Sequence, residues 1–146
     1  MQQWFMAVGN KFVSWLLRSP FHGLVSRNMA LISVQGKKTG RIYCFPVNYQ
    51  RSADSVWVTS YKYRSWWKNL RNGAQVTIRI HGIDFVGQAR VHETPAGVTE
   101  GLKTYFRLSP DTARFFSVKL DDDGSPDPVD LARIVPGRVV VEIKLS

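Results

Sequence analysis

The spacing of hydrophobic residues divides the chain into a helical start and a β-rich remainder. Between Gln2 and Arg18, aromatic and aliphatic residues recur at steps of three and four positions, the period of an amphipathic helix. Pro20 ends this pattern, because proline lacks the N–H that another helical turn needs. We therefore predict an N-terminal amphipathic helix within residues 1–20, followed by a separate body over residues 29–146.

From Met29 onward the hydrophobic period changes to two, which is typical of half-buried strands. Six antiparallel strands in a chain of this length predict a closed or half-closed barrel, which leaves no sheet edge exposed. The whole chain is then one domain, mainly β of the α+β type, with short inserted helices. The predicted strands are Ala30–Val34, Ile42–Gln50, Ser55–Tyr61, Gln75–Ile80, Ile83–His92 and Val139–Leu145.

Four segments between these strands break the alternation. Ser65 is a suitable N-cap for a short helix of about two turns, which Asn72-Gly73 ends. Thr94-Pro95 opens a helical stretch that reaches about Leu108. Residues 111–118 fit either a helix or a loop. Residues 121–128 are acidic and carry Gly and Pro, so we expect an exposed loop there.

The composition is that of an ordinary folded domain. The 146 residues are 44% hydrophobic and 21% charged. A chain of this size and composition can form a hydrophobic core without stabilising disulfides or a structural metal. Cys44 is the single cysteine, so no internal disulfide forms, and we expect a cytoplasmic protein. The sequence shows neither a secretory signal pattern nor an apolar run of membrane-spanning length. The three histidines share no ligand spacing, so no metal site is predicted.

The charge balance favours anionic partners. There are 20 Lys and Arg against 11 Asp and Glu, a formal net charge of +9. Nucleic acid, an anionic lipid surface and a phosphorylated small molecule all fit this charge. The aromatic stripe of the N-terminal helix leaves two interpretations open: packing on the barrel, or peripheral contact of residues 1–19 with a membrane surface.

The most informative motif is the turn between the first two predicted strands. Its two glycines, Gly36 and Gly40, let the backbone approach a ligand and point N–H groups into a shared concavity. Three cations and one hydroxyl lie between and beside them, a composition suited to holding a phosphate or carboxylate. An ordinary basic hairpin turn remains the alternative. The side chains concerned are Lys37, Lys38, Thr39 and Arg41.

A second motif alternates aromatic and cationic residues over Tyr61–Arg71. This mixture suits stacking of a planar anionic ligand or of nucleic-acid bases. The adjacent Trp66 and Trp67 face different directions, so we expect one in the core and one beside a pocket. A nucleic-acid-binding module is the alternative from another class, although no known nucleic-acid signature occurs. Cys44 lies in an apolar strand and is expected in the core rather than as a nucleophile. Since no catalytic acid, base or nucleophile stands out, a cofactor is expected to supply the chemistry.

Three segments together resemble a known family. They are Met29–Gly40, Pro46–Tyr49 and Ser65–Leu70, and they are similar to the deazaflavin-dependent nitroreductases and quinone reductases. Proteins of that family are split β-barrels that use coenzyme F420, and they are distant relatives of the FMN-binding pyridoxamine-phosphate oxidases. The sequence departs from many relatives at Ile42 and Tyr43, where those carry a Pro-Arg pair. The resemblance implies a split β-barrel with F420 as cofactor, and FMN or haem as alternatives within the superfamily.

The resemblance also implies which residues hold the cofactor. Those placed at its phosphate and acidic tail are Lys37, Lys38, Thr39, Gly40 and Arg41. Those placed beside its ring system are Pro46, Val47 and Asn48. Contacts from the end of the third strand are implied for Thr59, Ser60, Tyr61 and Lys62. The residues implied to line the binding site on the phosphate side of the cofactor are Trp66, Trp67 and Asn69.

The activity implied by the resemblance is hydride transfer to a small-molecule electron acceptor: a quinone, a nitroaromatic or an activated alkene. Tyr49, Ser60 and Tyr105 are the candidates for donating a hydrogen bond to the charge that develops on the acceptor. A cofactor carrier without turnover would need the same anion site and stays an alternative. Pairing of two chains into a homodimer is also expected, and a membrane quinone becomes a natural acceptor if the N-terminal helix contacts lipid.

Overall fold

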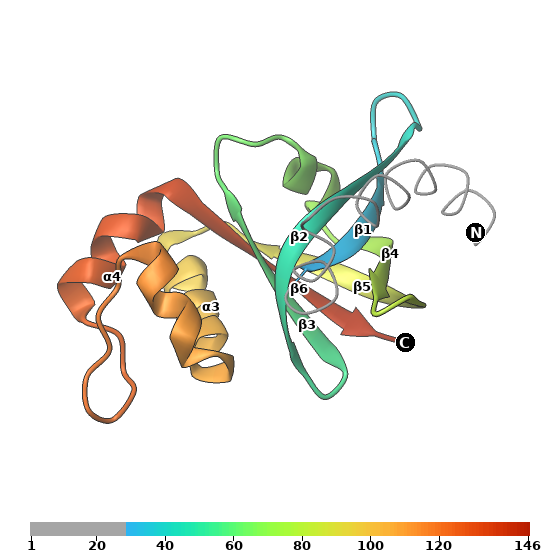
Figure 1. The fold of residues 1–146 in the computed structure, drawn as a ribbon. Helices are drawn as coiled ribbons and strands as arrows, with labels where there is room; N and C mark the ends of the chain where they lie inside the picture. Colours follow the sequence, from blue (N-terminus) through green and yellow to red (C-terminus); the bar gives the residue numbers. More distant parts are fainter. Residues whose placement is uncertain (1–28) are drawn as a thin grey trace.

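A computed structural model describes residues 29–146, whose strands form a closed antiparallel barrel (Figure 1). The order around the barrel is β1-β2-β3-β6-β5-β4, so β1 pairs with both β2 and β4. All six predicted strands are confirmed, whereas the helix predicted within residues 1–20 lies outside the described residues. The strands are β1 (Met29–Gln35), β2 (Ile42–Ser52), β3 (Ser55–Tyr61), β4 (Ala74–Ile80), β5 (Ile83–His92) and β6 (Arg138–Leu145).

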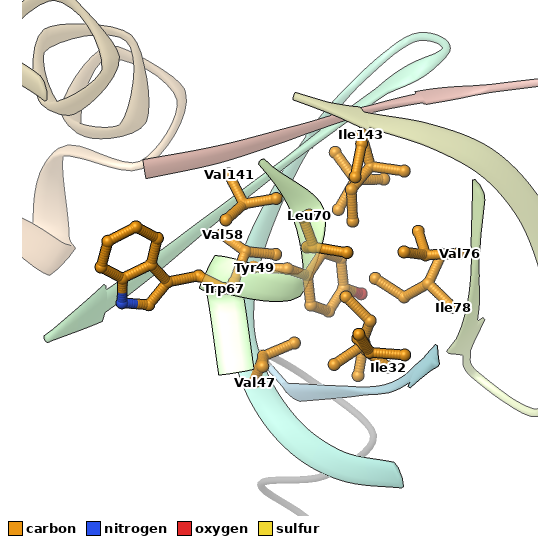
Figure 2. Close-up of a cluster of buried hydrophobic side chains, with 14 of the residues drawn as sticks. Ile32, Val47, Tyr49, Val58, Trp67, Leu70, Val76, Ile78, Val141 and Ile143 are labelled. Carbon is orange, nitrogen blue, oxygen red and sulfur yellow. The ribbon is translucent and has the colours of Figure 1, made fainter. Parts of the chain in front are cut away.

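The barrel interior holds the first of two hydrophobic cores. Alternate residues point inward along each strand, as Val139 and Val141 do in β6. Figure 2 shows the ring of Tyr49 inside the barrel, among side chains such as Ile32 and Ile78 from other strands. Val140 lies between the two inward-facing valines and points outward, where it belongs to the second core. One strand therefore serves both cores.

The second core lies where helices cover the outer face of β3 and β6. It is formed by α3 (Pro95–Leu108), the 3-10 helix η2 (Pro110–Phe116) and α4 (Pro128–Ile134). In Figure 1 these helices stand on one side of the barrel, away from the turn that joins β1 to β2. No helix within residues 29–146 is long and apolar enough to cross a membrane.

The helix ends show which local signals were interpreted correctly. The helix α3 begins at Thr94-Pro95 as predicted, and Thr94 caps it, since its Oγ1 accepts the Gly97 N–H at 3.1 Å. The short helix after β3 is the 3-10 helix η1 (Trp66–Leu70), and the predicted N-cap role of Ser65 was wrong. Ser65 has helical backbone angles, and its hydroxyl caps no N–H group, because a capping serine needs an extended backbone.

The helix α4 was missed by the sequence analysis. Residues 121–127 form the predicted loop, but Pro128 begins a helix that leads through η3 (Val135–Gly137) into β6. Asp127 caps α4, because its carboxylate accepts the Asp130 N–H at 3.0 Å. An Asp followed by Pro is a helix-start signal, so the local sequence did contain the information.

Candidate functional site

The turn over residues 36–41 is closed by its own hydrogen bonds. The Gly36 N–H donates to the Arg41 carbonyl at 2.7 Å, and the Gly40 N–H donates to the Gly36 carbonyl at 2.9 Å. Gly40 has a φ of +71°, a left-handed conformation in which a Cβ would be strained. The turn is therefore held in one shape, and it presents the exposed side chains of Lys38 and Arg41 to solvent.

The turn is fastened to η1, 32 positions further along the chain. The Lys37 N–H donates to Asn69 Oδ1 at 3.1 Å, and Lys37 Nζ donates to the Arg71 carbonyl at 2.7 Å. Asn69 Nδ2 in turn donates to the Trp66 carbonyl at 3.2 Å, which fixes the amide in this orientation. Two motifs that the sequence singled out separately are thus one structural unit.

A cavity of about 600 Å³ opens where the turn meets η1. Of the residues that the sequence implicated, Lys37, Gly40 and Asn69 line it. No carboxylate is among the described residues of its lining, so the cations around its mouth are not neutralised there. Four further polar residues line the cavity that the sequence analysis did not single out: Ser33, Gln35, Gln75 and Thr77.

These four missed residues belong to β1 and β4. Ser33, Gln75 and Thr77 each lie between inward-facing hydrophobic residues, as Ser33 does between Ile32 and Val34, and Gln35 follows the inward-facing Val34, so all four point to the outer face. The alternation by itself indicates polar outward positions on two strands. Only the antiparallel pairing of β1 with β4, which sets Ser33 opposite Thr77, shows that these positions adjoin.

Ser60 and Trp66 connect the end of β3 to η1. Trp66 Nε1 donates to Ser60 Oγ at 2.9 Å, and the Trp66 ring meets the edge of Phe45 at 5.0 Å between centroids. The Ser60 side chain is buried and also lies 3.3 Å from the Tyr61 carbonyl. The implicated Ser60, Trp66 and Asn69 are therefore joined by direct hydrogen bonds.

Of the two adjacent tryptophans, one lies in the core as predicted, whereas the other is not among the residues that line the cavity. Trp67 is only 1% exposed and belongs to the barrel core, whereas Trp66 is half-buried. The Arg71 guanidinium lies 5.0 Å from the Trp67 ring and forms two hydrogen bonds of 2.9 Å with Glu93. Arg71 thereby ties η1 to the segment that follows β5.

The three implicated residues of β2 do not share a face. Val47 is buried in the barrel core, so its side chain points away from the outer surface. Pro46 and Asn48 alternate with it and point outward. A ligand on the outer face of β2 would contact Pro46 and Asn48 through side chains and Val47 through its main chain alone.

The implicated residues at the end of β3 do not line the cavity. The side chains of Thr59 and Gln50 adjoin the phenol of Tyr105, a residue of α3. Tyr61 is exposed, with the Arg138 guanidinium 3.8 Å from its ring centroid, and the Lys62 N–H donates to the Gly137 carbonyl at 2.9 Å. The main-chain donor of Lys62 is therefore already engaged within the fold.

The three candidate hydrogen-bond donors lie in different environments. Burial raises the pKa of Tyr49, inside the barrel, and nearby Arg51 partly opposes the shift. Burial also raises the pKa of Tyr105, which is 2% exposed in the second core. Both phenols therefore keep their protons at neutral pH. None of the three, Ser60 included, lines the cavity, and within residues 29–146 no three His, Cys, Asp or Glu side chains could hold a metal ion.

The groups around the turn fit an anionic cofactor. Among the described residues, Lys38 and Arg41 form no ion pair, and the main-chain N–H groups of Lys38 and Thr39 have no hydrogen-bond acceptor. Exposed cations beside unpaired amides are the donor set that phosphate and carboxylate oxygens require. The adjoining cavity has the volume of ordinary ligand sites, roughly 300–1,000 Å³.

The family assignment agrees with this chemistry. Residues 20–108, more than half of the chain, match the family described as F420H(2)-dependent quinone reductase. The chain belongs to this family, and it is an oxidoreductase that depends on coenzyme F420. Comparison with curated proteins gives no significant match.

Solved structures with the same fold are distant in sequence. A structure described as a domain-swapped dimer has a TM-score of 0.54 and 14% identity, covering 92% of this chain and 95% of its own. A Clostridium acetobutylicum protein of the pyridoxinephosphate oxidase family, related to general stress protein 26, has a TM-score of 0.54 and 9% identity, with coverages of 97% and 83%. An F420-H2 dependent reductase, FDR-A, has a TM-score of 0.50 and 14% identity, with coverages of 81% and 95%. The split β-barrel predicted from the resemblance is confirmed.

Proposed function

We propose that this F420-dependent reductase transfers hydride to a quinone, a nitroaromatic or an activated alkene, and that it holds the cofactor's phosphate and acidic tail at the turn over residues 36–41. The observation that carries the proposal is the pair of hydrogen bonds from Lys37 to Asn69 and Arg71. They join the cationic turn to the tryptophan-bearing η1 around one cavity, whose lining within residues 29–146 contains no carboxylate. This is the arrangement that the family resemblance implies.

In this proposal the residues have distinct tasks. Lys38 and Arg41 bind anionic oxygens, while Lys37 and Asn69 hold the turn in position. The outward side chains of Pro46 and Asn48 face the ring system, which, when reduced and bound, supplies the hydride. Further contacts implied by the resemblance are kept as proposals for Thr39, Gly40, Val47, Thr59, Tyr61, Lys62, Trp66 and Trp67.

Of the three candidate donors to the acceptor, Ser60 is our choice. Its Oγ accepts the Trp66 N–H, and the Trp66 carbonyl accepts the Asn69 amide, which lines the cavity. The hydroxyl proton of Ser60 faces the Tyr61 carbonyl across a long 3.3 Å contact, so little is lost when it turns to another acceptor. Tyr49 and Tyr105 are held inside the two hydrophobic cores.

The test is a titration of the full chain with F420 and, in parallel, with FMN, followed by intrinsic tryptophan fluorescence. We expect F420 to bind, and a Lys38→Gln/Arg41→Gln variant to bind at least about tenfold more weakly, since charged hydrogen bonds are lost. A Lys103→Gln/Arg107→Gln variant removes the same charge from α3 and should bind like the parent. Equal losses in both variants, or binding of FMN alone, would contradict the proposed site or cofactor.

The substrate class is tested with the reduced cofactor and a panel of acceptors. We expect a quinone, a nitroarene or an activated alkene to reoxidise the cofactor. At cofactor concentrations below saturation, the rate of this reoxidation should be lower in the Lys38→Gln/Arg41→Gln variant. A panel in which no such acceptor reoxidises the bound cofactor would refute the proposed substrate classes.

Two features of assembly are part of the proposal. Homodimer formation is supported by the similar fold of a protein described as a domain-swapped dimer, and sedimentation of the full chain tests it. Membrane contact was predicted for residues 1–19, which lie outside the described residues. Unchanged vesicle binding and quinone turnover after their deletion would contradict that prediction.

A further inference from the structure

Arg71 bonds to two segments at once, one through its side chain and one through its main chain. Its Nε and Nη2 each donate a hydrogen bond of 2.9 Å to one oxygen of the Glu93 carboxylate, the paired geometry that makes arginine–carboxylate contacts strong. Its carbonyl accepts a hydrogen bond from Lys37 Nζ at 2.7 Å. Since Lys37 belongs to the turn over residues 36–41, Arg71 connects that turn to Glu93.

Glu93 is well anchored, because the residues on either side of it are bonded to the rest of the fold. It lies at the junction between the end of β5 and the start of α3. His92 Nε2 lies 2.9 Å from a carboxylate oxygen of Glu142 on β6, and the Thr94 hydroxyl caps α3. The carboxylate of Glu93 therefore gives the Arg71 side chain a fixed point of attachment.

The position of Arg71 affects the cationic turn directly. Arg71 follows η1 immediately, and its guanidinium also lies 5.0 Å from the centre of the Trp67 ring. A shift of Arg71 would move the carbonyl that accepts Lys37 Nζ. Because the turn is closed by its own hydrogen bonds, Lys38 and Arg41 would move together with Lys37.

The charge of Glu93 has the opposite effect from its bonding. A carboxylate near an anion-binding turn repels the anion, so by charge alone Glu93 would weaken binding. Glu93 is not among the described residues that line the cavity, so it does not touch a ligand there. Any favourable effect of Glu93 on an anionic ligand must therefore be transmitted through Arg71.

We propose that Glu93 is a positioning residue for the cofactor. It holds Arg71, whose carbonyl holds Lys37, and in this way it keeps the turn in the shape that binds the cofactor's phosphate. The inference rests on the proposed function, because it takes the phosphate to be bound at this turn. It extends the site to the junction of β5 and α3, where the family resemblance places no binding residue.

The experiment measures F420 binding to the full chain by tryptophan fluorescence in two variants that break the same ion pair. Glu93→Gln removes a negative charge, whereas Arg71→Gln removes a positive charge and keeps the carbonyl that accepts Lys37. We expect both variants to bind F420 about two- to fivefold more weakly, a modest effect because the paired side chains are 46% and 32% exposed. An effect of charge alone would make Glu93→Gln bind more tightly. Tighter or unchanged binding by Glu93→Gln would overturn the inference.

A double-mutant cycle shows whether Glu93 acts through Arg71. In the Arg71→Gln background, Glu93→Gln should weaken F420 binding no further, and equal weakening in both backgrounds would overturn the inference. Asp84→Asn is the matched control, because it breaks a two-bond ion pair with Arg79 and removes the same charge next to the β4–β5 turn. It should bind F420 like the parent. An equal loss in Asp84→Asn would overturn the specific role of Glu93.

Amide hydrogen exchange of the ligand-free chain supplies a readout that does not depend on F420. In Glu93→Gln and in Arg71→Gln, the bonded N–H groups of Gly36 and Gly40 should exchange about two- to fivefold faster than in the parent, while exchange in β6 stays unchanged. Parent-like exchange in the turn, or faster exchange throughout the barrel, would overturn the inference and leave the proposed function intact. Failure of the parent to bind F420 would instead overturn the proposed function itself.

Discussion

Asn69 Oδ1 accepts the Lys37 N–H at 3.1 Å and so joins η1 to the turn between β1 and β2. Replacing Asn69 with Ala should lower the free energy of unfolding by about 1 kcal/mol, the net value of a typical hydrogen bond. It should also weaken F420 binding, because the turn loses its anchor. Urea unfolding and fluorescence titration measure the two effects.

Asn69→Asp separates these two effects. The carboxylate keeps the acceptor for the Lys37 N–H but loses the donor to the Trp66 carbonyl, so the unfolding free energy should fall by about 1 kcal/mol, much as in Asn69→Ala. The new negative charge lies at the cavity and should weaken F420 binding further. Parent-like binding by both variants would show that Asn69 has only a structural role.

The hydrogen bond from Trp66 Nε1 to Ser60 Oγ makes a second prediction. Ser60→Ala leaves the half-buried indole donor unpaired and should cost about 1–2 kcal/mol in urea unfolding. In a Trp66→Phe background the same change should cost much less, because the donor is already absent. Additive costs in this double-mutant cycle would mean that the two side chains do not interact.

The close approach of α3 to β6 depends on Gly101. A Cβ at this position would lie 2.9 Å from Val140 Cβ, and Val140 is itself fully buried. Gly101→Ala should therefore lower stability by about 1–3 kcal/mol despite its better helix propensity, and Val140→Ala should restore part of the loss. Gly137→Ala is the control, since its Cβ meets nothing within 4 Å. A stabilised Gly101→Ala variant would contradict this packing.

The buried phenol of Tyr105 predicts a loss of stability in alkali. Burial raises its pKa in the folded chain, while in the unfolded chain the phenol ionises at its ordinary value of about 10. Above that pH the unfolded chain binds fewer protons, so stability falls as pH rises, by at most about 1.4 kcal/mol per pH unit for this group. Tyr105→Phe should flatten the decline in urea unfolding. Tyr63→Phe, at a 77% exposed site, should leave it unchanged.

Local patterns were sufficient for most of the fold. Alternating hydrophobic residues located all six strands, and Thr94 correctly marked the start of α3, since both signals depend on neighbours in sequence. The short helix after β3 was predicted, but Ser65 did not cap it. The helix α4 was overlooked because the acidic loop before it was taken to extend through Pro128.

The candidate site was only partly accessible from the sequence. The cationic turn and the Trp-containing η1 were each recognised, and the family that they resemble proved to be the one to which the chain belongs. The inward direction of Val47 and the burial of Tyr105 between α3 and the barrel followed from strand register and helix packing. These depend on pairings between distant segments, which no local pattern specifies.

The sequence by itself determined the six strands, the start of α3, the cationic character of the turn and the family, because each depends on residue types and short spacings. Only the tertiary structure decided that Lys37 meets Asn69, and that the outer faces of β1 and β4 form a polar floor beneath them. The reason is that barrel closure brings together strands far apart in the chain. Closure is driven by burial of the whole interior and not by any one motif.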